Sequence, residues 1–436
     1  MKLFSAASFS CRLIVSLCLS GSAALSAEKL PAKAIVKIQK RGADFALLRD
    51  GVPFYVKGVC GIERLDLAAS LGANSMRTYS SDNARAILDQ AKANGLTVTL
   101  GVWLSHKADE YKNPAYRAKI RQEVRALVLA AKEHPATLMY SLGNETNSGA
   151  DSPEAWAFIN ELADTIHKAD PDHPVMTVLM GSKPDMLNNV AKYAPALDLL
   201  GINAYGSIFS VPKDIESSNF KGAYVISEFG PLGPWEVPKT SWGAPIELSS
   251  DKKALFYKKA ADFILENRAR CIGSYVFQWG QKQERTPTWF GMFLENRPAL
   301  GLRGEACPTV EMMGSVWGAP PPKNQSPIFQ GIKVNGAEGT KDWMVSPKTK
   351  FTVEMIVKDP DDDPLTYCWE VLAEATQLGE GGSKEERPQG IQNAVKAVSP
   401  GAAEVIAPQP GKYRIFGYAL DGKGHAATMN LPFLVR

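Results

Sequence analysis

The stretch Thr137-Leu-Met-Tyr-Ser-Leu-Gly-Asn-Glu145 carries a largely apolar run straight into a glycine, an amide and a carboxylate. An apolar run of this length that ends at glycine is typical of a parallel strand with both faces buried. A second stretch, Ala223-Tyr-Val-Ile-Ser-Glu228, repeats the arrangement, with a carboxylate directly after the run. The two stretches predict parallel strands that each lead into a glutamate.

Eight strand-like runs alternate with amphipathic helical segments between about residue 30 and residue 315. The runs cover residues 55–59, 74–78, 97–102, 137–142, 175–179, 199–203, 223–227 and 272–277. Eight β-then-α units over this length have the size and order of a (β/α)8 TIM barrel. A doubly wound open sheet is the alternative, but residues 56–61 lack the glycine spacing of its phosphate-binding loop.

The end of the chain has a different pattern. A proline-rich linker, 318–327, follows the predicted barrel domain at 28–317. Residues 328–436 hold short alternating strands, which predict a small all-β immunoglobulin-like sandwich. Within it, Asp359-Pro-Asp-Asp-Asp-Pro364 favours an Asp/Pro turn, and a calcium site of hard oxygen ligands is the alternative.

Residues 1–27 have the pattern of a secretory signal peptide. Lys2 and Arg12 carry positive charge, a short apolar run ends at Leu19, and small residues follow to Ala27. The apolar run is shorter than the ~18 residues that span a membrane. We therefore expect a soluble mature protein that is periplasmic or secreted.

The composition is that of an ordinary globular protein. The 436 residues include 49 Lys+Arg and 46 Asp+Glu, a net charge of +3, which argues against a nucleic-acid partner. The cysteines beyond the signal peptide are Cys60, Cys271, Cys307 and Cys368. They lack the spacing of a disulfide framework or a zinc site, and Cys60 and Cys271 fall at opposite ends of neighbouring strands. We expect no metal and no cofactor.

Glu145 and Glu228 follow the fourth and seventh predicted strands. The carboxyl ends of all barrel strands open on one face, so the two side chains can meet across its mouth. Such a pair suits glycosidic bond cleavage, where the leaving oxygen needs a proton and the anomeric carbon needs a nucleophile or an activated water. Repulsion between the two charges keeps one carboxyl protonated as the general acid. The spacing decides the outcome: ~5–5.5 Å gives retention and ~6.5–9.5 Å gives inversion.

The motifs around these glutamates resemble clan A of the glycoside hydrolases. His134-Pro-Ala-Thr-Leu-Met-Tyr-Ser-Leu-Gly-Asn-Glu145 and Ser227-Glu-Phe-Gly230 are most similar to the barrel of family two, the β-galactosidase and β-glucuronidase family. Phe54-Tyr-Val-Lys-Gly-Val59 and Gly72-Ala-Asn-Ser-Met-Arg77 resemble the clan's first two strands. Arg77-Thr-Tyr-Ser80 also resembles the β-1,3-glucan hydrolases and glucanosyltransferases of the clan. The resemblance covers roughly residues 34–315.

The resemblance implies roles for individual residues. Glu145 would be the acid/base and Glu228 the nucleophile of a retaining mechanism. Asn144 would hold the sugar 2-hydroxyl. Arg77 would lie beneath the nucleophile and favour its ionised form, and Tyr205 would donate a hydrogen bond to it.

Aromatic residues near the strand ends are further candidates for binding a sugar. The resemblance implies that Trp279, just past the eighth strand, forms the floor under the ring. Trp103 and His106 follow the third strand and are candidates for lining the cleft. Trp235 and Trp242, in a long loop after Glu228, either stack on sugar faces or pin the loop.

The expected partner is a β-linked oligo- or polysaccharide, for which a β-glucan is one candidate, with no nucleic acid and no membrane insertion. The same residues would also serve a transglycosylase, in which a second sugar replaces water. A glycan-binding barrel without catalysis is the alternative from another class of protein. Family-two enzymes usually carry β-domains ahead of the barrel, whereas here the predicted barrel starts soon after the predicted signal peptide. This departure from the family pattern leaves the sugar and its linkage open.

Overall fold

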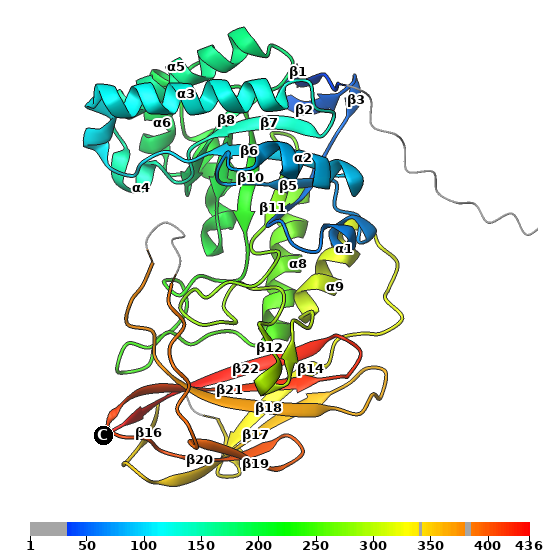
Figure 1. Ribbon diagram of the computed structural model, residues 1–436, viewed down its shortest axis with the longest axis vertical. Helices are drawn as coiled ribbons and strands as arrows, with labels where there is room; N and C mark the ends of the chain where they lie inside the picture. Colours follow the sequence, from blue (N-terminus) through cyan, green and yellow to red (C-terminus); the bar gives the residue numbers. More distant parts are fainter. Residues whose placement is uncertain (1–32, 340–341, 380–384) are drawn as a thin grey trace, which may run out of the picture.

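The computed structural model describes residues 33–339, 342–379 and 385–436. The predicted signal peptide, 1–27, lies outside the described residues. Figure 1 shows two parts, a barrel surrounded by helices and, beyond α8 and α9, a β-sandwich. Within the described ranges, no helix combines the length and the apolar character that crossing a bilayer requires.

Eight parallel strands close the barrel, which confirms the predicted fold. Their order is β10-β11-β4-β5-β6-β7-β8-β9, and β11 pairs with β4 to complete the ring. The bounds are β4 Val56–Cys60, β5 Ser75–Arg77, β6 Thr97–Val102, β7 Thr137–Leu142, β8 Val175–Met180, β9 Leu199–Asn203, β10 Ala223–Phe229 and β11 Cys271–Val276. Cys60 ends β4 and Cys271 begins β11, and both are free thiols.

Helices cover the outside of the barrel and bury their apolar faces against the strands. They are α1 Leu65–Ser70, α2 Ala84–Ala93, α3 Pro114–Ala131, α4 Asn147–Ala150, α5 Pro153–Ala169, α6 Pro184–Tyr193, α7 Val211–Glu216, α8 Ser250–Glu266 and α9 Pro308–Trp317. Local sequence sets where the two long helices α3 and α5 begin. Each has proline at its first position, and the preceding Asn113 or Ser152 accepts a hydrogen bond from a backbone N–H of the first turn.

A small antiparallel sheet closes the amino-terminal end of the barrel. It consists of β1 Val36–Arg41, β2 Asp44–Arg49 and β3 Val52–Pro53. Val36 N donates to Asp172 O and Phe45 N to Ala269 O, both in loops that lead into barrel strands. The sequence pattern does not predict this sheet. With the amino-terminal end covered in this way, the carboxyl ends of the strands are the open face.

The last part of the chain is a β-sandwich, as predicted. One sheet has the order β15-β14-β17-β20-β19 and the other β16-β22-β21-β18. The bounds are β14 Ile328–Val334, β15 Ala337–Glu338, β16 Trp343–Val345, β17 Lys350–Lys358, β18 Thr366–Ala373, β19 Val395–Ser399, β20 Ala402–Ile406, β21 Gly411–Leu420 and β22 Ala426–Val435. Phe351 and Val353 of β17 and Ile415 of β21 belong to a core shared by both sheets.

The sandwich is docked on the barrel through buried polar contacts. Arg414 of β21, which is only 1% exposed, donates to Pro245 O at 2.8 Å. Thr428 N donates to Ser250 Oγ at the start of α8 at 2.9 Å. Asn430 Nδ2 donates to Glu247 Oε2 at 2.7 Å. These contacts join the sandwich to the segment between β10 and α8, so the sandwich lies beside the open face of the barrel.

Candidate active site

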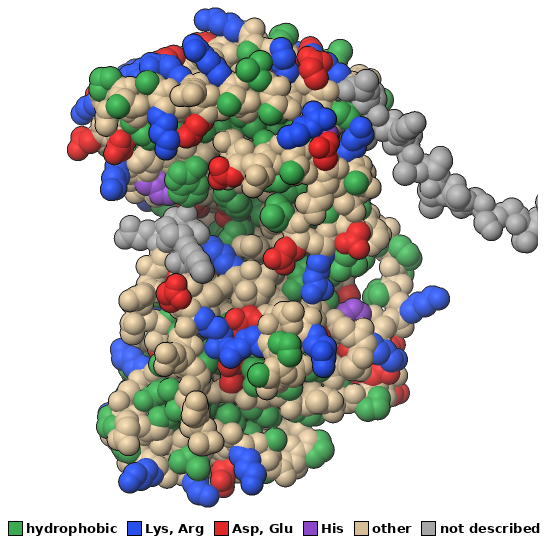
Figure 2. All heavy atoms as spheres, in the orientation of Figure 1, with side chains coloured by type: hydrophobic (Ala, Val, Ile, Leu, Met, Phe, Trp, Pro, Cys, Tyr) green, Lys and Arg blue, Asp and Glu red, His purple; other side chains and the backbone are tan. Residues whose placement is uncertain are grey.

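A cavity of about 1270 Å³ opens at the carboxyl ends of the barrel strands. Figure 2 shows the surface hollowed between the barrel and the sandwich. Glu145 after β7 and Glu228 in β10 both line this cavity, as does Asn203 at the end of β9. The structure thus brings the two predicted glutamates to one space at the face where barrel enzymes carry their active sites.

Glu228 is held by three donors and is only 5% exposed. Its Oε1 accepts hydrogen bonds from Arg77 Nη1 at 3.0 Å and from the Tyr79 hydroxyl at 2.9 Å. Its Oε2 accepts from the Tyr205 hydroxyl at 3.0 Å. The predicted contacts of Arg77 and Tyr205 are present. Three donors from β5, the residues after β5, and the residues after β9 fix the orientation of both carboxylate oxygens.

Glu145 lies in a different environment. Its backbone has a φ of +52°, and its N–H donates to Val178 O of β8 at 2.9 Å. Its Oε1 accepts one hydrogen bond, from Asn203 Nδ2 at 3.0 Å. Burial, reinforced by the negative charge of Glu228, raises the pKa of Glu145 to about 7. One carboxyl of the pair is therefore suited to keep its proton near neutral pH.

A chain of hydrogen bonds connects the two carboxylates. Asn144 Oδ1 accepts from Arg77 Nη2 at 2.6 Å and from Asn203 Nδ2 at 3.2 Å. Arg77 also bonds Glu228, and Asn203 also bonds Glu145, so the side chain of Asn144 joins the supports of both acids. Asn203 Oδ1 in turn accepts from Ser227 Oγ at 2.8 Å. The relative placement of the two glutamates is thereby fixed from four strand ends.

The predicted aromatic residues have different positions. Trp103 is 44% exposed and lines the cavity. His106 supports the turn before Glu145 instead of lining the cavity, because its Nε2 lies 2.7 Å from Asn144 O. Trp235 lines the cavity edge-on to the ring of Tyr205.

The prediction that Trp279 forms the floor of the site is wrong. Its side chain is fully buried between Phe293 and Trp317 and does not line the cavity. Trp279 N donates to Cys60 O at the end of β4, and the indole packs against Trp317 of α9 and donates through Nε1 to Arg64 O. Phe277 lines the cavity instead.

Two residues that donate a hydrogen bond directly to one of the glutamates, Tyr79 and Asn203, were not among the predicted site residues. Tyr79 lies two positions after Arg77, the spacing that places side chains on one face of an extended chain. Asn203 is the last residue of β9, the same kind of position that singled out the glutamates. A search for every polar residue at a strand end would have found Asn203.

The sandwich supplies part of the cavity wall through the segment that joins β18 to β19. Gly379, Glu385, Glu386 and Arg387 line the cavity. Glu385 Oε2 accepts from Arg285 N of the barrel at 2.6 Å. Arg387 pairs with Glu295 of the barrel at 2.8 Å and with Glu370 of β18 at 2.7 Å. The charged, glycine-rich sequence of this segment predicts a loop but gives no sign that it reaches the barrel.

Comparisons with known proteins support the assignment of the barrel fold. Residues 62–219 match the TIM barrel domain of the glycosyl hydrolases family 2. A β-glucuronidase from Paenibacillus borealis is 27% identical over 165 residues, which are 36% of this chain and 26% of that protein.

Solved structures show the same fold. A family 2 β-galacturonidase from Eisenbergiella tayi bound to galacturonate is 18% identical, with a TM-score of 0.50 over 65% of this chain and 54% of that one. A β-D-glucuronidase from Dictyoglomus thermophilum is 17% identical, with a TM-score of 0.52 over 66% and 54%. The chain spans about half the length of these structures and about a quarter of the curated relative. Residues 62–219 are thus similar to the TIM barrel domain of the family 2 glycosyl hydrolases, and the solved structures of family 2 enzymes share the barrel fold of this chain.

Proposed function

We propose that this protein is a retaining glycoside hydrolase that cleaves a β-linked glycan by double displacement. One observation carries the proposal: two carboxyl groups share a cavity, and their surroundings suit opposite tasks. Glu228 is oriented by Arg77, Tyr79 and Tyr205, whereas burial raises the pKa of Glu145 to about 7. The match to family 2 barrels and the names of the relatives support the same chemistry.

In the first step, protonated Glu145 gives its proton to the glycosidic oxygen while Glu228 attacks the anomeric carbon. The bond to the leaving group breaks, and a covalent bond forms between the sugar and Glu228. In the second step, Glu145 is ionised and takes a proton from water, which attacks the same carbon and releases Glu228. Two inversions leave the β configuration unchanged.

Other residues of the cavity would position the sugar. Asn144 accepts its two internal hydrogen bonds at Oδ1, so its amino group is the part that can donate to a sugar 2-hydroxyl. Trp103 and Trp235 line the cavity and offer aromatic faces for stacking on pyranose rings. The cavity volume of about 1270 Å³ exceeds the ~300–1,000 Å³ of ordinary small-molecule pockets, which favours an oligosaccharide.

The charge of the cavity favours an uncharged glycan, such as a β-glucan, over a uronide. Of the described residues that line it, three are basic and seven are acidic: Lys183, Lys282 and Arg387 against Glu145, Asp214, Glu228, Glu236, Glu284, Glu385 and Glu386. Lys282 pairs with Glu284 at 2.5 Å, and Arg387 pairs with two glutamates. A uronide carboxylate would therefore enter an acidic cavity in which two of the three cations are already paired.

The test of the chemistry is covalent trapping. A 2-deoxy-2-fluoro-β-glycoside with an activated leaving group slows the second step, so we expect one sugar per chain on the peptide that contains Glu228. Mass spectrometry of the digested protein measures the label, and Glu228→Gln is the control that should stay unlabelled. Label on another residue, or turnover without any covalent sugar, would exclude the proposed mechanism.

The substrate is tested by a screen of β-1,2-, β-1,3-, β-1,4- and β-1,6-linked glucans together with aryl β-glucosides and aryl β-glucuronides. We expect the neutral glycosides to be cleaved faster than the glucuronides. Faster cleavage of the glucuronides would reject the charge argument while leaving the mechanism intact. Products longer than the starting oligosaccharide would show transfer to a second sugar.

The pH dependence of kcat/KM follows from Glu145. The group must be protonated to act as the acid, so activity is expected to fall as the pH rises through about 7, the raised pKa of this carboxyl. If the pKa of Glu145 had its ordinary value of 4.5, activity would begin to fall at a much lower pH. Initial rates from about pH 4 to about pH 9 measure this limb. If the residual activity of Glu145→Gln fell over the same pH range, the fall in activity would belong to the titration of another group.

A further inference from the structure

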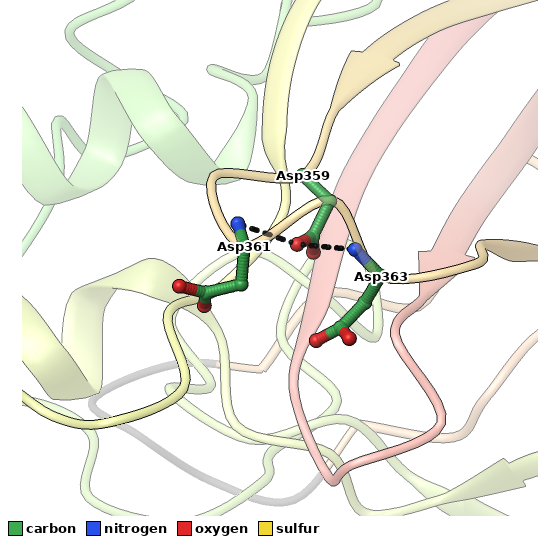
Figure 3. Close-up of side chains that lie close together, drawn as sticks. All are labelled: Asp359, Asp361 and Asp363. Atoms are coloured by element: carbon green, nitrogen blue, oxygen red, sulfur yellow. Dashed lines mark hydrogen bonds between the residues drawn. The ribbon is translucent and has the colours of Figure 1, made fainter.

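Three carboxylates gather in the turn between β17 and β18 of the sandwich, far along the chain from the glutamate pair. They belong to Asp359, Asp361 and Asp363, and one oxygen from each lies within 4.8 Å of the others. Figure 3 shows Asp359 between the other two side chains, with its carboxylate facing the space that they border. Asp359 Oδ1 accepts hydrogen bonds from the backbone N–H groups of Asp361 at 2.9 Å and Asp363 at 3.1 Å.

Two carboxylate oxygens of this turn are buried without a donor. Asp359 is 4% exposed, and its Oδ2 has no hydrogen-bond partner within the described chain. The side chain of Asp363 is 10% exposed, and its Oδ2 likewise has none. A buried carboxylate oxygen that loses its water and gains no donor is unfavourable, and two in one turn also repel each other. A cation bound in this turn would therefore stabilise both carboxylate oxygens.

The protein itself supplies little positive charge at this place. Lys423 Nζ pairs with Asp363 Oδ1 at 2.6 Å, but its side chain is 55% exposed and the bond is to the other oxygen of that carboxylate. Two further acids lie close: the negative charge of Asp361 raises the pKa of Glu311, after the larger effect of burial. Asp421 is also near, since Lys423 N donates to its Oδ1. One exposed lysine does not balance three clustered carboxylates.

We propose that this turn binds a divalent cation, Ca²⁺, through Asp359 Oδ2 and the carboxylates of Asp361 and Asp363. All three side chains offer hard oxygen ligands and no nitrogen or sulfur, which selects Ca²⁺ or Mg²⁺ over transition metals. Ca²⁺ binds oxygens at about 2.3–2.6 Å, so two ligands on opposite sides of it lie up to about 5 Å apart. The 4.8 Å span of the cluster fits that geometry. Waters and backbone carbonyls complete the coordination of Ca²⁺ in such sites.

The site would also connect the linker to the sandwich. Gln325 N donates to Asp361 Oδ2 at 2.6 Å, and the next residue, Ser326, donates through its hydroxyl to Glu311 of α9. The turn therefore contacts the segment that joins the barrel to the sandwich. A cation held by Asp361 would order this junction, and we expect its loss to lower the stability of the sandwich before that of the barrel.

The test uses the full-length protein, freed of metal with EDTA and titrated with CaCl₂. Isothermal titration calorimetry should show one Ca²⁺ per chain, and the midpoint of thermal unfolding should rise by about 5 °C or more at saturation. Asp361→Asn keeps the side-chain shape and should weaken Ca²⁺ binding by at least about 10-fold, because it removes one ligand charge. Its circular dichroism spectrum verifies folding.

The matched control is Asp362→Asn in the same turn. Asp362 is exposed, has a φ of +59° that asparagine adopts readily, and does not belong to the cluster. Its Ca²⁺ affinity should equal that of the unmodified protein. No heat of binding and no thermal shift with CaCl₂ would overturn the proposal, as would an equal loss of affinity in both variants. The same shift with MgCl₂ at equal concentration would assign the site to Mg²⁺ and overturn its selectivity for Ca²⁺.

Discussion

Replacing Glu228 with alanine is expected to abolish hydrolysis of every glycoside, however good its leaving group. The proposed mechanism loses its nucleophile in this variant, so kcat/KM should fall by about 10⁴-fold or more. The variant also leaves room for a small anion. Added azide should enter that space and attack the same carbon, giving an α-glycosyl azide of inverted configuration.

The control for this variant is Glu228→Gln, which keeps the size of the side chain. Arg77 is 1% exposed and bonds Glu228, so the alanine variant leaves a buried cation short of a partner and should be less stable. The glutamine oxygen can still accept hydrogen bonds from Arg77 and Tyr79, and its amino group can donate to the Tyr205 hydroxyl. It should fold normally and remain inactive. Substantial turnover by Glu228→Gln would remove Glu228 from the nucleophile's role.

Replacing Glu145 with alanine is expected to have an effect that depends on the leaving group. Under the proposed mechanism, unactivated glycans need a proton from Glu145, so their hydrolysis should fall by about 10²–10⁴-fold. A dinitrophenyl glycoside leaves without a proton, so its first step should be nearly unchanged and the glycosyl-enzyme should accumulate. Azide should then attack the intermediate from the β face and give a product of retained configuration.

Rapid-mixing measurements of the dinitrophenol burst and of the steady state separate the two steps. The opposite product configurations with azide distinguish the acid/base from the nucleophile within one pair of variants. A uniform loss of rate for all leaving groups in Glu145→Ala would show that Glu145 positions the sugar and does not transfer a proton.

Much of the barrel can be predicted because the sequence patterns that mark its strands are local. The runs that form β6, β7 and β9 are continuously buried, and their composition marks both ends of each strand. The positions of Glu145 and Glu228 follow from the same property, since a polar residue at the carboxyl end of a buried strand must lie at the barrel's mouth. Neither requires knowledge of contacts between distant segments.

The features that the sequence did not predict depend on contacts between segments that lie far apart along the chain. Trp279 follows β11 closely, as a residue of the site would, but its indole is buried against Phe293 and Trp317, which lie far along the chain from it or in another element. The strands β1 and β2 are short and carry charged residues at their ends, and they gain their place only by covering the barrel's closed end. Arg387 belongs to a loop of the sandwich, and only the docking of that domain brings it to the cavity.

The boundary between the two domains and the boundary of the cavity do not coincide, because residues of both domains line the cavity. The proline-rich linker marks where one folding unit stops and the next starts, yet Glu386 and Arg387 beyond it border the same space as Glu145. Under the proposed function, variation in the sandwich would therefore change which glycans are accepted while the two glutamates stay unchanged. Exchanging that module between homologous chains becomes a route to new selectivity, and amputating it would expose the reacting sugar to bulk water on one side.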